Sequence, residues 1–177
     1  MQLRLKFLNG NNIMRLIKLL IISLLVLGLL VTAISALFPS TVIVSRAVEV
    51  SASSAQIEKQ VSNLNEWEHW MSDWKDNKSV LKDSTMFIGT QTIKLVSKND
   101  TAVIYHWVAT GQRPYTVKFE WIPLQQGIYV IHWSFEQHVK WYPWEKFQTL
   151  LNEKVLGYKM EMELANLRDI LLRANNQ

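Results

Sequence analysis

The feature that most restricts the possible folds is a run of apolar residues near the N-terminus. No charged side chain lies between Lys18 and Arg46, and the run from Leu19 to Phe38 reads LLIISLLVLGLLVTAISALF. About 20 such residues in a helix cross the roughly 30 Å of hydrocarbon in a bilayer. The sequence therefore predicts a transmembrane helix over residues 19–38.

A cleaved secretory signal is the alternative interpretation of this run. Ala33 and Ser35 are small enough to precede a cleavage site. The run is longer than the roughly 7 to 15 apolar residues of a signal peptide, however, and this length favours an uncleaved anchor.

The distribution of charge predicts the orientation of this helix. Four basic residues and no acidic residue precede it, namely Arg4, Lys6, Arg15 and Lys18. Because Lys and Arg flanking a membrane helix stay in the cytoplasm, we expect residues 1–18 to be cytoplasmic. The rest of the chain, residues 39–177, would then be one periplasmic or extracellular domain.

The same charges exclude some functions for that domain. The net charge of +4 equals the charge of the four N-terminal basic residues, so residues 39–177 are neutral and nucleic acid is not an expected partner. The chain has no cysteine, which excludes disulfides and thiolate metal sites. It also has no Gly-rich phosphate loop and no hydrolase or metalloprotease motif, so we expect no cofactor.

Patterns after Pro39 predict a strand, a helix and then a meander of strands. In TVIVSRAVEV, valines recur at every second position with Arg46 as the exception, and SASSAQIEKQVSNL has the caps and spacing of a short amphipathic helix. From about residue 79 to 139, strands are separated by the turn sequences KND, GQRP and QQG. Strands joined by such short turns pair antiparallel.

Alternation along three of these strands places aromatic residues on one face of the sheet. The predicted inner face contains Val103, Tyr105 and Trp107, then Tyr115, Val117, Phe119 and Trp121, then Tyr129, Ile131, Trp133 and Phe135. The alternating positions are mostly polar. Such a face needs a cover, and the stripe Leu156, Met160, Leu164, Leu167 and Leu171 predicts a long helix over residues 155–174 that supplies it. Lys154, Lys159, Glu163 and Arg168 are expected on its other sides.

This order of elements resembles the helix-grip fold of the START-like superfamily, also called the SRPBCC or polyketide cyclase/lipid-transport group. The resemblance lies in VSRAVEVSASSAQIEKQVSNLNEWEHWMSDW at the start and LGYKMEMELANLRDIL at the end. It implies an α+β fold in which a curved antiparallel sheet wraps a long C-terminal helix. It also implies a cavity between them that holds lipids, sterols, polyketides or other apolar molecules.

We therefore predict a binding module for a lipid or other apolar small molecule, with the aromatic face as the wall of its cavity. The predicted ligand-binding residues are Tyr105, Trp107, Tyr115, Phe119, Trp121, Tyr129, Trp133 and Phe135, with Trp70 and Trp144 near the openings. The buried hydroxyls and indole N–H groups of such a face need partners, which a partly open cavity would provide. The alternative is that the rings fill an ordinary core.

Two further aromatic segments have more than one interpretation. Trp67, Trp70 and Trp74 are spaced to form one helical stripe that seals the end of the sheet, but they also suit the mouth of a pocket or the level of lipid headgroups. The segment KWYPWEKF, residues 140–147, is either a rigid structural turn or a loop that controls entry to the cavity.

Two other functional classes remain as alternatives. The first is a cyclase or hydrolase with Tyr105 or Tyr115 as an acid, which a buried carboxylate or histidine in the cavity would favour. The second is a structural protein with a filled interior that binds a membrane partner. His132, Glu136 and His138 alternate with Trp133 and Phe135, so we expect them on the solvated face and not at a metal site.

Overall fold

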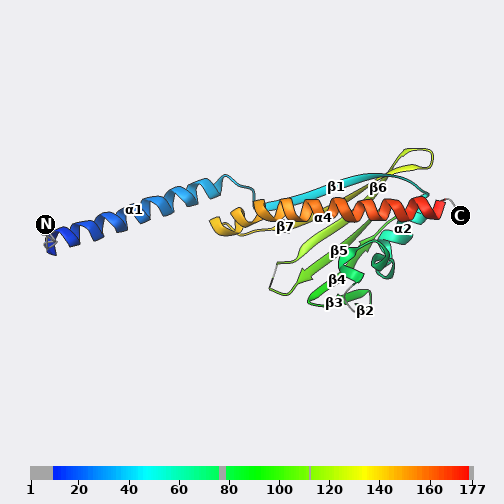
Figure 1. The fold of residues 1–177 in the computed structure, drawn as a ribbon, viewed down its shortest axis with the longest axis horizontal. Coiled ribbons are helices and arrows are strands. Elements are labelled where there is room, and N and C mark those ends of the chain that lie inside the picture. Colours follow the sequence, from blue (N-terminus) through cyan, green and yellow to red (C-terminus); the bar gives the residue numbers. More distant parts are fainter. Residues whose placement is uncertain (1–9, 76–78, 112, 176–177) are drawn as a thin grey trace, which may run out of the picture.

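The computed structural model describes residues 10–75, 79–111 and 113–175. Arg4 and Lys6, on which the predicted orientation partly depends, lie outside this part of the chain. Figure 1 shows one long helix, α1, that projects from a folded domain of strands and helices.

Helix α1 (Gly10–Ala36) begins nine residues before the predicted membrane span of residues 19–38 and ends two residues before the end of that span. Its residues Asn12–Ala36 are long and apolar enough to cross a membrane. Nearly all of its described side chains are exposed, as expected of a helix that has no protein around it. Pro39 follows its last turn, where a proline cannot continue a helix.

The domain is built on one antiparallel sheet in the order β1-β7-β6-β5-β4-β3-β2. The strands are β1 (Thr41–Ser51), β2 (Ser79–Lys82), β3 (Thr85–Ile88), β4 (Gln91–Lys98), β5 (Ala102–Ala109), β6 (Tyr115–Gln125) and β7 (Ile128–His138). The predicted meander is thus correct, and the first strand closes it by pairing with the last, for example Val44 with Phe135. Asp83 and Ser84 both have positive φ in the tight turn between β2 and β3.

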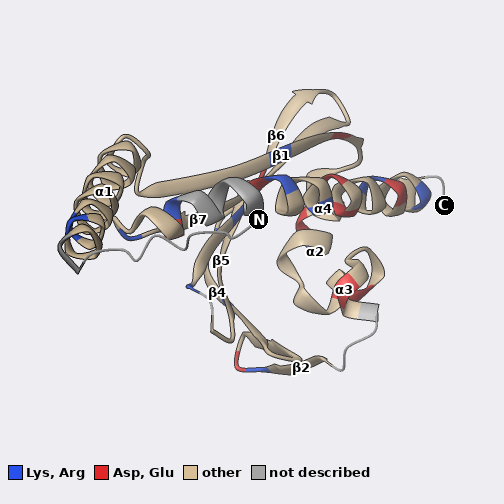
Figure 2. Ribbon diagram, turned by 60° about the vertical axis from the view of Figure 1, so that its left-hand side comes forward, with Lys and Arg blue, Asp and Glu red and all other residues tan. Residues whose placement is uncertain are grey.

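All the helices of the domain lie on one side of this sheet (Figures 1 and 2). Between β1 and β2 the chain forms α2 (Ser54–Ser62), the 3-10 helix η1 (Leu64–His69) and α3 (Ser72–Lys75). A capping box between Ser53 and Gln56 starts α2. The C-terminal helix α4 (Pro143–Asn175) begins twelve residues before the predicted start at Val155.

The buried residues agree with the predicted inner face. Val103, Tyr105, Val117, Phe119, Trp121, Ile131, Trp133 and Phe135 are buried, and Trp107, Tyr115 and Tyr129 are half-buried against them. The buried hydrophobic residues of α4 are Met160, Leu164, Leu167 and Leu171, which are four of the five residues of the predicted stripe. The structure is therefore the expected α+β helix-grip fold, in which the sheet wraps α4.

Candidate ligand-binding pocket

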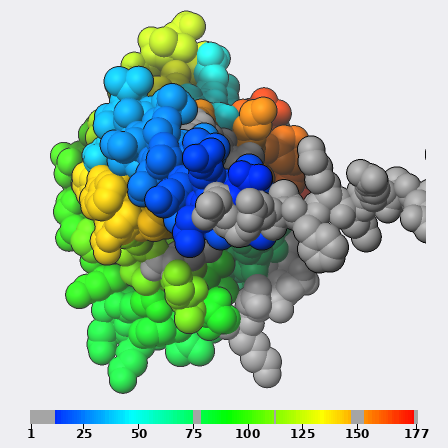
Figure 3. All heavy atoms as spheres, turned by 90° about the vertical axis from the view of Figure 1, so that its left-hand side faces the viewer, coloured from blue at the N-terminus to red at the C-terminus, as the bar shows by residue number. Residues whose placement is uncertain are grey.

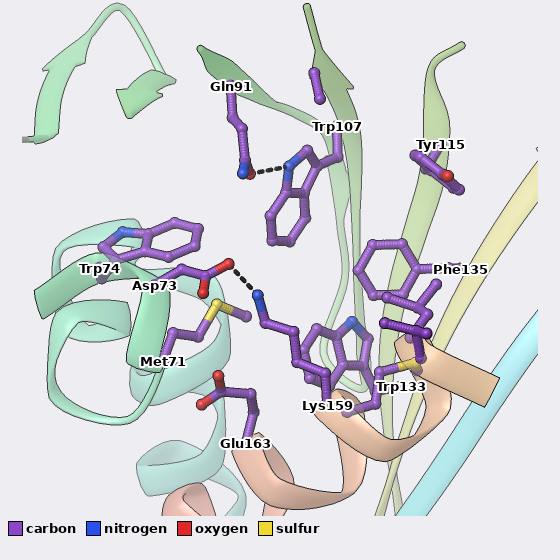
Figure 4. Close-up of a pocket in the computed structure, with 14 residues that line it drawn as sticks. Met71, Asp73, Trp74, Gln91, Trp107, Tyr115, Trp133, Phe135, Lys159 and Glu163 are labelled. Carbon is purple, nitrogen blue, oxygen red and sulfur yellow. Dashed lines mark hydrogen bonds and ion pairs between the residues drawn. The ribbon is translucent and has the colours of Figure 1, made fainter. Parts of the chain in front are cut away.

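A pocket lies beside α4, at the end of the sheet where β5 ends and β6 begins (Figure 4). It has a volume of about 270 Å³. Its walls come from the sheet, from the α3 segment and from one side of α4. The lining residues are Met71, Asp73, Trp74, Gln91, Trp107, Ala109, Tyr115, Trp133, Phe135, Val155, Leu156, Lys159, Met160 and Glu163.

The sheet contributes an aromatic wall to this pocket. The ring of Phe135 lies among the other rings of this wall. Its centroid is 5.4 Å from those of Trp107 and Trp133 and 5.8 Å from that of Tyr115. The indole N–H of Trp107 donates to Gln91 Oε1 at 2.8 Å, which holds that ring in place. These four aromatic residues were all predicted as ligand-binding from their alternation.

The opposite wall also contains charged side chains, which the spacing of apolar residues did not predict. Lys159 of α4 forms an ion pair with Asp73 of α3. One helical turn along α4, Glu163 is only 1% exposed, and its two carboxylate oxygens accept hydrogen bonds from the backbone N–H of Ser72 at 3.0 and 3.1 Å. It also accepts from the Ser72 hydroxyl and from Asn166 Nδ2.

Lys159 and Glu163 were expected on the sides of α4 away from the leucine stripe, and the structure shows that α3 packs against them there. Spacing along the helix shows which residues share the leucine stripe, but α3 packs beside that stripe and covers the neighbouring positions. A carboxylate can be buried there when it accepts hydrogen bonds, as Glu163 does from Ser72. Lys159 stays half-exposed in its ion pair with Asp73.

The other predicted ligand-binding residues do not line this pocket. Trp70, Tyr105, Phe119 and Trp121 are fully buried in the core, Tyr129 is half-buried at its edge, and Trp144 is exposed. The Trp121 indole N–H donates to Ser54 Oγ at 2.9 Å, so its polar group has a protein partner. For these residues, the structure places rings in a filled core or outside it.

Tyr105 is also not placed to act as an acid. Its hydroxyl donates to the carbonyl oxygens of Val61 at 2.9 Å and Ser62 at 3.1 Å, on the α2 side of the core. Burial raises the pKa of this phenol, since desolvation disfavours the phenolate. Both the position and the pKa therefore oppose proton transfer to a ligand.

The segment with Trp67, Trp70 and Trp74 seals the core, as in the first of its three interpretations. All three rings are buried, and Trp67 lies 5.1 Å from the ring of Tyr105 and 5.5 Å from that of Phe119. They do not lie on one helix, because η1 ends before Trp70 and α3 starts after it. Trp74 alone also contributes to the pocket.

The histidine residues of β7 are on the solvated face, as expected. His132 and His138 are exposed, and Glu136 is half-exposed beside His138. Within residues 10–75, 79–111 and 113–175, no three His, Asp or Glu side chains are grouped in a way that would hold a metal ion.

No protein-family model matches this sequence, and no curated protein matches it significantly. Solved structures do share the fold. A START superfamily protein from Mycobacterium smegmatis gives a TM-score of 0.58 at 15% identity, over 75% of this chain and 98% of that one. The di-domain ARO/CYC protein StfQ from the steffimycin biosynthetic pathway gives 0.59 at 9% identity, over 77% and 52% of the two chains.

A third similar structure is CalU16 from Micromonospora echinospora, with a TM-score of 0.52 at 12% identity, over 72% of this chain and 80% of that one. At these identities the similarity concerns the fold and not the activity. The part of the chain that follows α1 therefore has the helix-grip fold of these structures.

Proposed function

We propose that this chain is a membrane-anchored binding protein that holds an apolar small molecule, or the apolar part of a lipid, between the sheet and α4. The observation that carries the proposal is the pocket itself, in which Trp107, Tyr115, Trp133 and Phe135 face a cavity of about 270 Å³. Ligand pockets are mostly apolar with a few polar groups that orient the ligand. Gln91, Asp73 and Lys159 would be those groups here.

The size of the cavity restricts the ligand. Pockets for drug-sized molecules have volumes of about 300 to 1,000 Å³, so this one is at the lower limit. It suits a small apolar molecule or a single acyl chain better than a whole two-chain lipid. Exposed Val155 lies at the rim, where a longer ligand would emerge.

The proposed protein has three parts. Residues 1–18 would be the cytoplasmic N-terminus, residues 19–38 the span and residues 39–177 the START-like domain in the periplasm or outside the cell. What supports the anchor is the length and apolar surface of α1.

A buried carboxylate in the cavity was the feature expected of an enzyme, and Glu163 is one. However, its two oxygens already accept hydrogen bonds from Ser72 and Asn166. A general base needs a free lone pair directed at its substrate. We therefore assign Glu163 to holding α3 against α4, and we prefer binding to catalysis.

Filling the pocket tests the proposal. Ala109 lines the cavity from β5, so Ala109→Phe would place a ring inside it. Val108, the preceding residue, is exposed on the outer face, and Val108→Phe is the matched control. The full chain is purified in mild detergent, and bound molecules are detected by native mass spectrometry and identified after extraction.

We expect the wild type and Val108→Phe to carry a discrete added mass, and Ala109→Phe to lose it. Circular dichroism checks that all three proteins are folded. A folded Ala109→Phe protein that keeps the added mass would show that the ligand lies elsewhere. A wild type that takes up nothing, even from an added lipid extract, would contradict a binding function.

A further inference from the structure

A second aromatic group lies outside the pocket, in the turn between β7 and α4. Trp141 and Trp144 are 64% and 66% exposed, although most other tryptophans of the chain are buried. The ring of Tyr142 lies between them, 4.8 Å from each between centroids and nearly parallel to that of Trp144. We call these three residues the junction cluster. Contiguous exposed rings of this size indicate a surface that contacts a partner or a membrane.

Polar contacts keep the junction cluster in one arrangement. Pro143 starts α4 with a backbone angle that already suits the first helical position. The Glu145 carboxylate accepts from the backbone N–H of Lys140 at 2.9 Å and from Arg113 Nη2 at 3.0 Å. These hydrogen bonds therefore fix the turn that carries the three rings.

The cluster lies at the end of α1. The Ser35 hydroxyl, in the last turn of that helix, donates to the carbonyl oxygen of Trp141 at 3.4 Å. The buried ammonium of Lys146 donates to the carbonyl oxygens of Ser35 at 3.1 Å and Phe38 at 2.6 Å. A cation at the C-terminal carbonyls of a helix is favourable, and this contact joins α4 directly to α1.

The surroundings of the cluster match the boundary of a bilayer. Leu37 is 85% exposed and follows Ser35, whose hydroxyl contacts the cluster, by two residues. Figure 3, viewed from the side on which α1 leaves the domain, shows the gold segment before α4 next to the blue helix and facing the viewer. If α1 spans the membrane, this is the surface that faces the lipid.

We propose that Trp141, Tyr142, Trp144 and Leu37 insert into the headgroup layer of the bilayer that α1 crosses. Tryptophan and tyrosine are enriched at this level because their rings have an apolar body and a polar edge. Together with Lys146, they hold the domain in a defined orientation on the membrane. This inference rests on the membrane anchoring in the proposed function.

The orientation determines where the pocket lies. Helix α4 runs away from α1 along the long axis of the molecule (Figure 1). Leu156, a half-buried pocket residue of α4, follows Trp144 by twelve positions, which is about 18 Å of helix. The pocket would therefore stand clear of the headgroups, open to the aqueous side.

Fluorescence quenching by lipid tests the proposal. The full chain is reconstituted in vesicles of phosphatidylcholine and phosphatidylglycerol whose acyl chains are brominated near the headgroup. We expect bromine to quench the wild type, and the double variant Trp141→Phe with Trp144→Phe to lose most of that quenching. The remaining six tryptophans are buried or half-buried in the domain, where lipid does not reach them.

A tryptophan placed further along α4 is the matched control. Tyr158 is exposed and follows Trp144 by about 21 Å of helix. In the double-variant background, Tyr158→Trp should be quenched by aqueous acrylamide but not by the brominated lipid.

Each result has a distinct meaning. Vesicle flotation of the full chain without quenching by the brominated lipid would overturn the insertion of the cluster while leaving the anchor intact. Rings protected from both lipid and acrylamide would show a protein partner or a second copy on this surface, and would also overturn it. Failure of the chain to float with the vesicles would overturn the anchoring and this inference together.

Discussion

At the scale of single residues, Tyr105 shows how the core uses an aromatic ring with a polar group. Its ring packs against Trp67, while its hydroxyl donates to two carbonyl oxygens at the end of α2. A buried hydroxyl with partners contributes about 0.5 to 1.5 kcal/mol, and the same group without partners would destabilise the fold. Tyr105 thus links β5 of the sheet to α2, which covers it.

We expect Tyr105→Phe to lower the free energy of unfolding by about 1 kcal/mol near neutral pH. The difference should shrink above about pH 10 and change sign by about pH 11. In the folded protein the pKa of Tyr105 is raised by burial, so above the ordinary value of about 10 only the unfolded state loses the proton. By about pH 11, the free energy of unfolding of the wild type should therefore have fallen by about 1.4 kcal/mol more than that of the variant.

Denaturant unfolding in mild detergent, followed by tryptophan fluorescence, measures this effect because most of the tryptophans are in the core. Tyr158→Phe is the control. Tyr158 is exposed, so its replacement should change neither the free energy of unfolding nor the dependence of that energy on pH. Equal alkaline slopes in the wild type and in Tyr105→Phe would show that Tyr105 ionises normally in the folded state.

At the scale of elements, Gly157 determines how closely α4 approaches β1. A Cβ atom at this position would lie 2.1 Å from Arg46 Nη2, so the glycine leaves room for the arginine. The Arg46 side chain lies against α4 at Gly157, and its Nε donates to Glu161 Oε1 at 2.6 Å. Arg46 is the exception in the valine pattern of β1, and its partner on α4 explains why it is tolerated.

A double-mutant cycle tests this arrangement. In the background of Arg46→Ala, Gly157→Ala should stabilise the protein by about 1 kcal/mol, because alanine favours a helix over glycine. In the wild type, the same change displaces Arg46, and loss of the ion pair should offset up to about 1 kcal/mol of that gain. Identical effects in both backgrounds, measured by the same unfolding assay, would show that the arginine and the glycine are not coupled.

At the scale of the whole molecule, the arrangement of charges predicts the side of the membrane on which the domain lies. Four basic residues precede the apolar span, of which Arg15 and Lys18 lie in the N-terminal part of α1, whereas residues 39–177 are neutral (Figure 2). We expect alkaline phosphatase fused after Gln177 to be active and β-galactosidase at the same position to be inactive, because the former folds only outside the cytoplasm.

Replacement of the four N-terminal basic residues with glutamine is the control for this topology. It should increase the fraction of inverted molecules, since the positive charges that hold the N-terminus inside are lost. Active β-galactosidase in the unmodified fusion would show that the domain is cytoplasmic.

Much of the fold was predictable from local patterns. Alternation predicts which side of β5, β6 and β7 is inside, because successive side chains on a strand point to opposite faces. Trp121 and Trp133 are buried as this rule requires. The same rule places His132 outside, where it is.

The early start of α4 was not predictable in this way. Its first turn is stabilised by contacts with distant residues, in particular Arg113 on Glu145 and the α1 carbonyl oxygens on Lys146. Such contacts leave no periodic signal in the sequence.

The sequence by itself determined the apolar helix, the antiparallel meander and the aromatic inner face, since each depends on the spacing of neighbouring residues. Only the tertiary structure decided which rings line a cavity and which fill the core. Trp107 and Tyr105 share one face of β5, but α2 and η1 cover Tyr105, while Trp107 lies where the sheet, α3 and α4 leave a gap. Alternation identifies the face of a residue, and the packing of remote elements determines what lies opposite it.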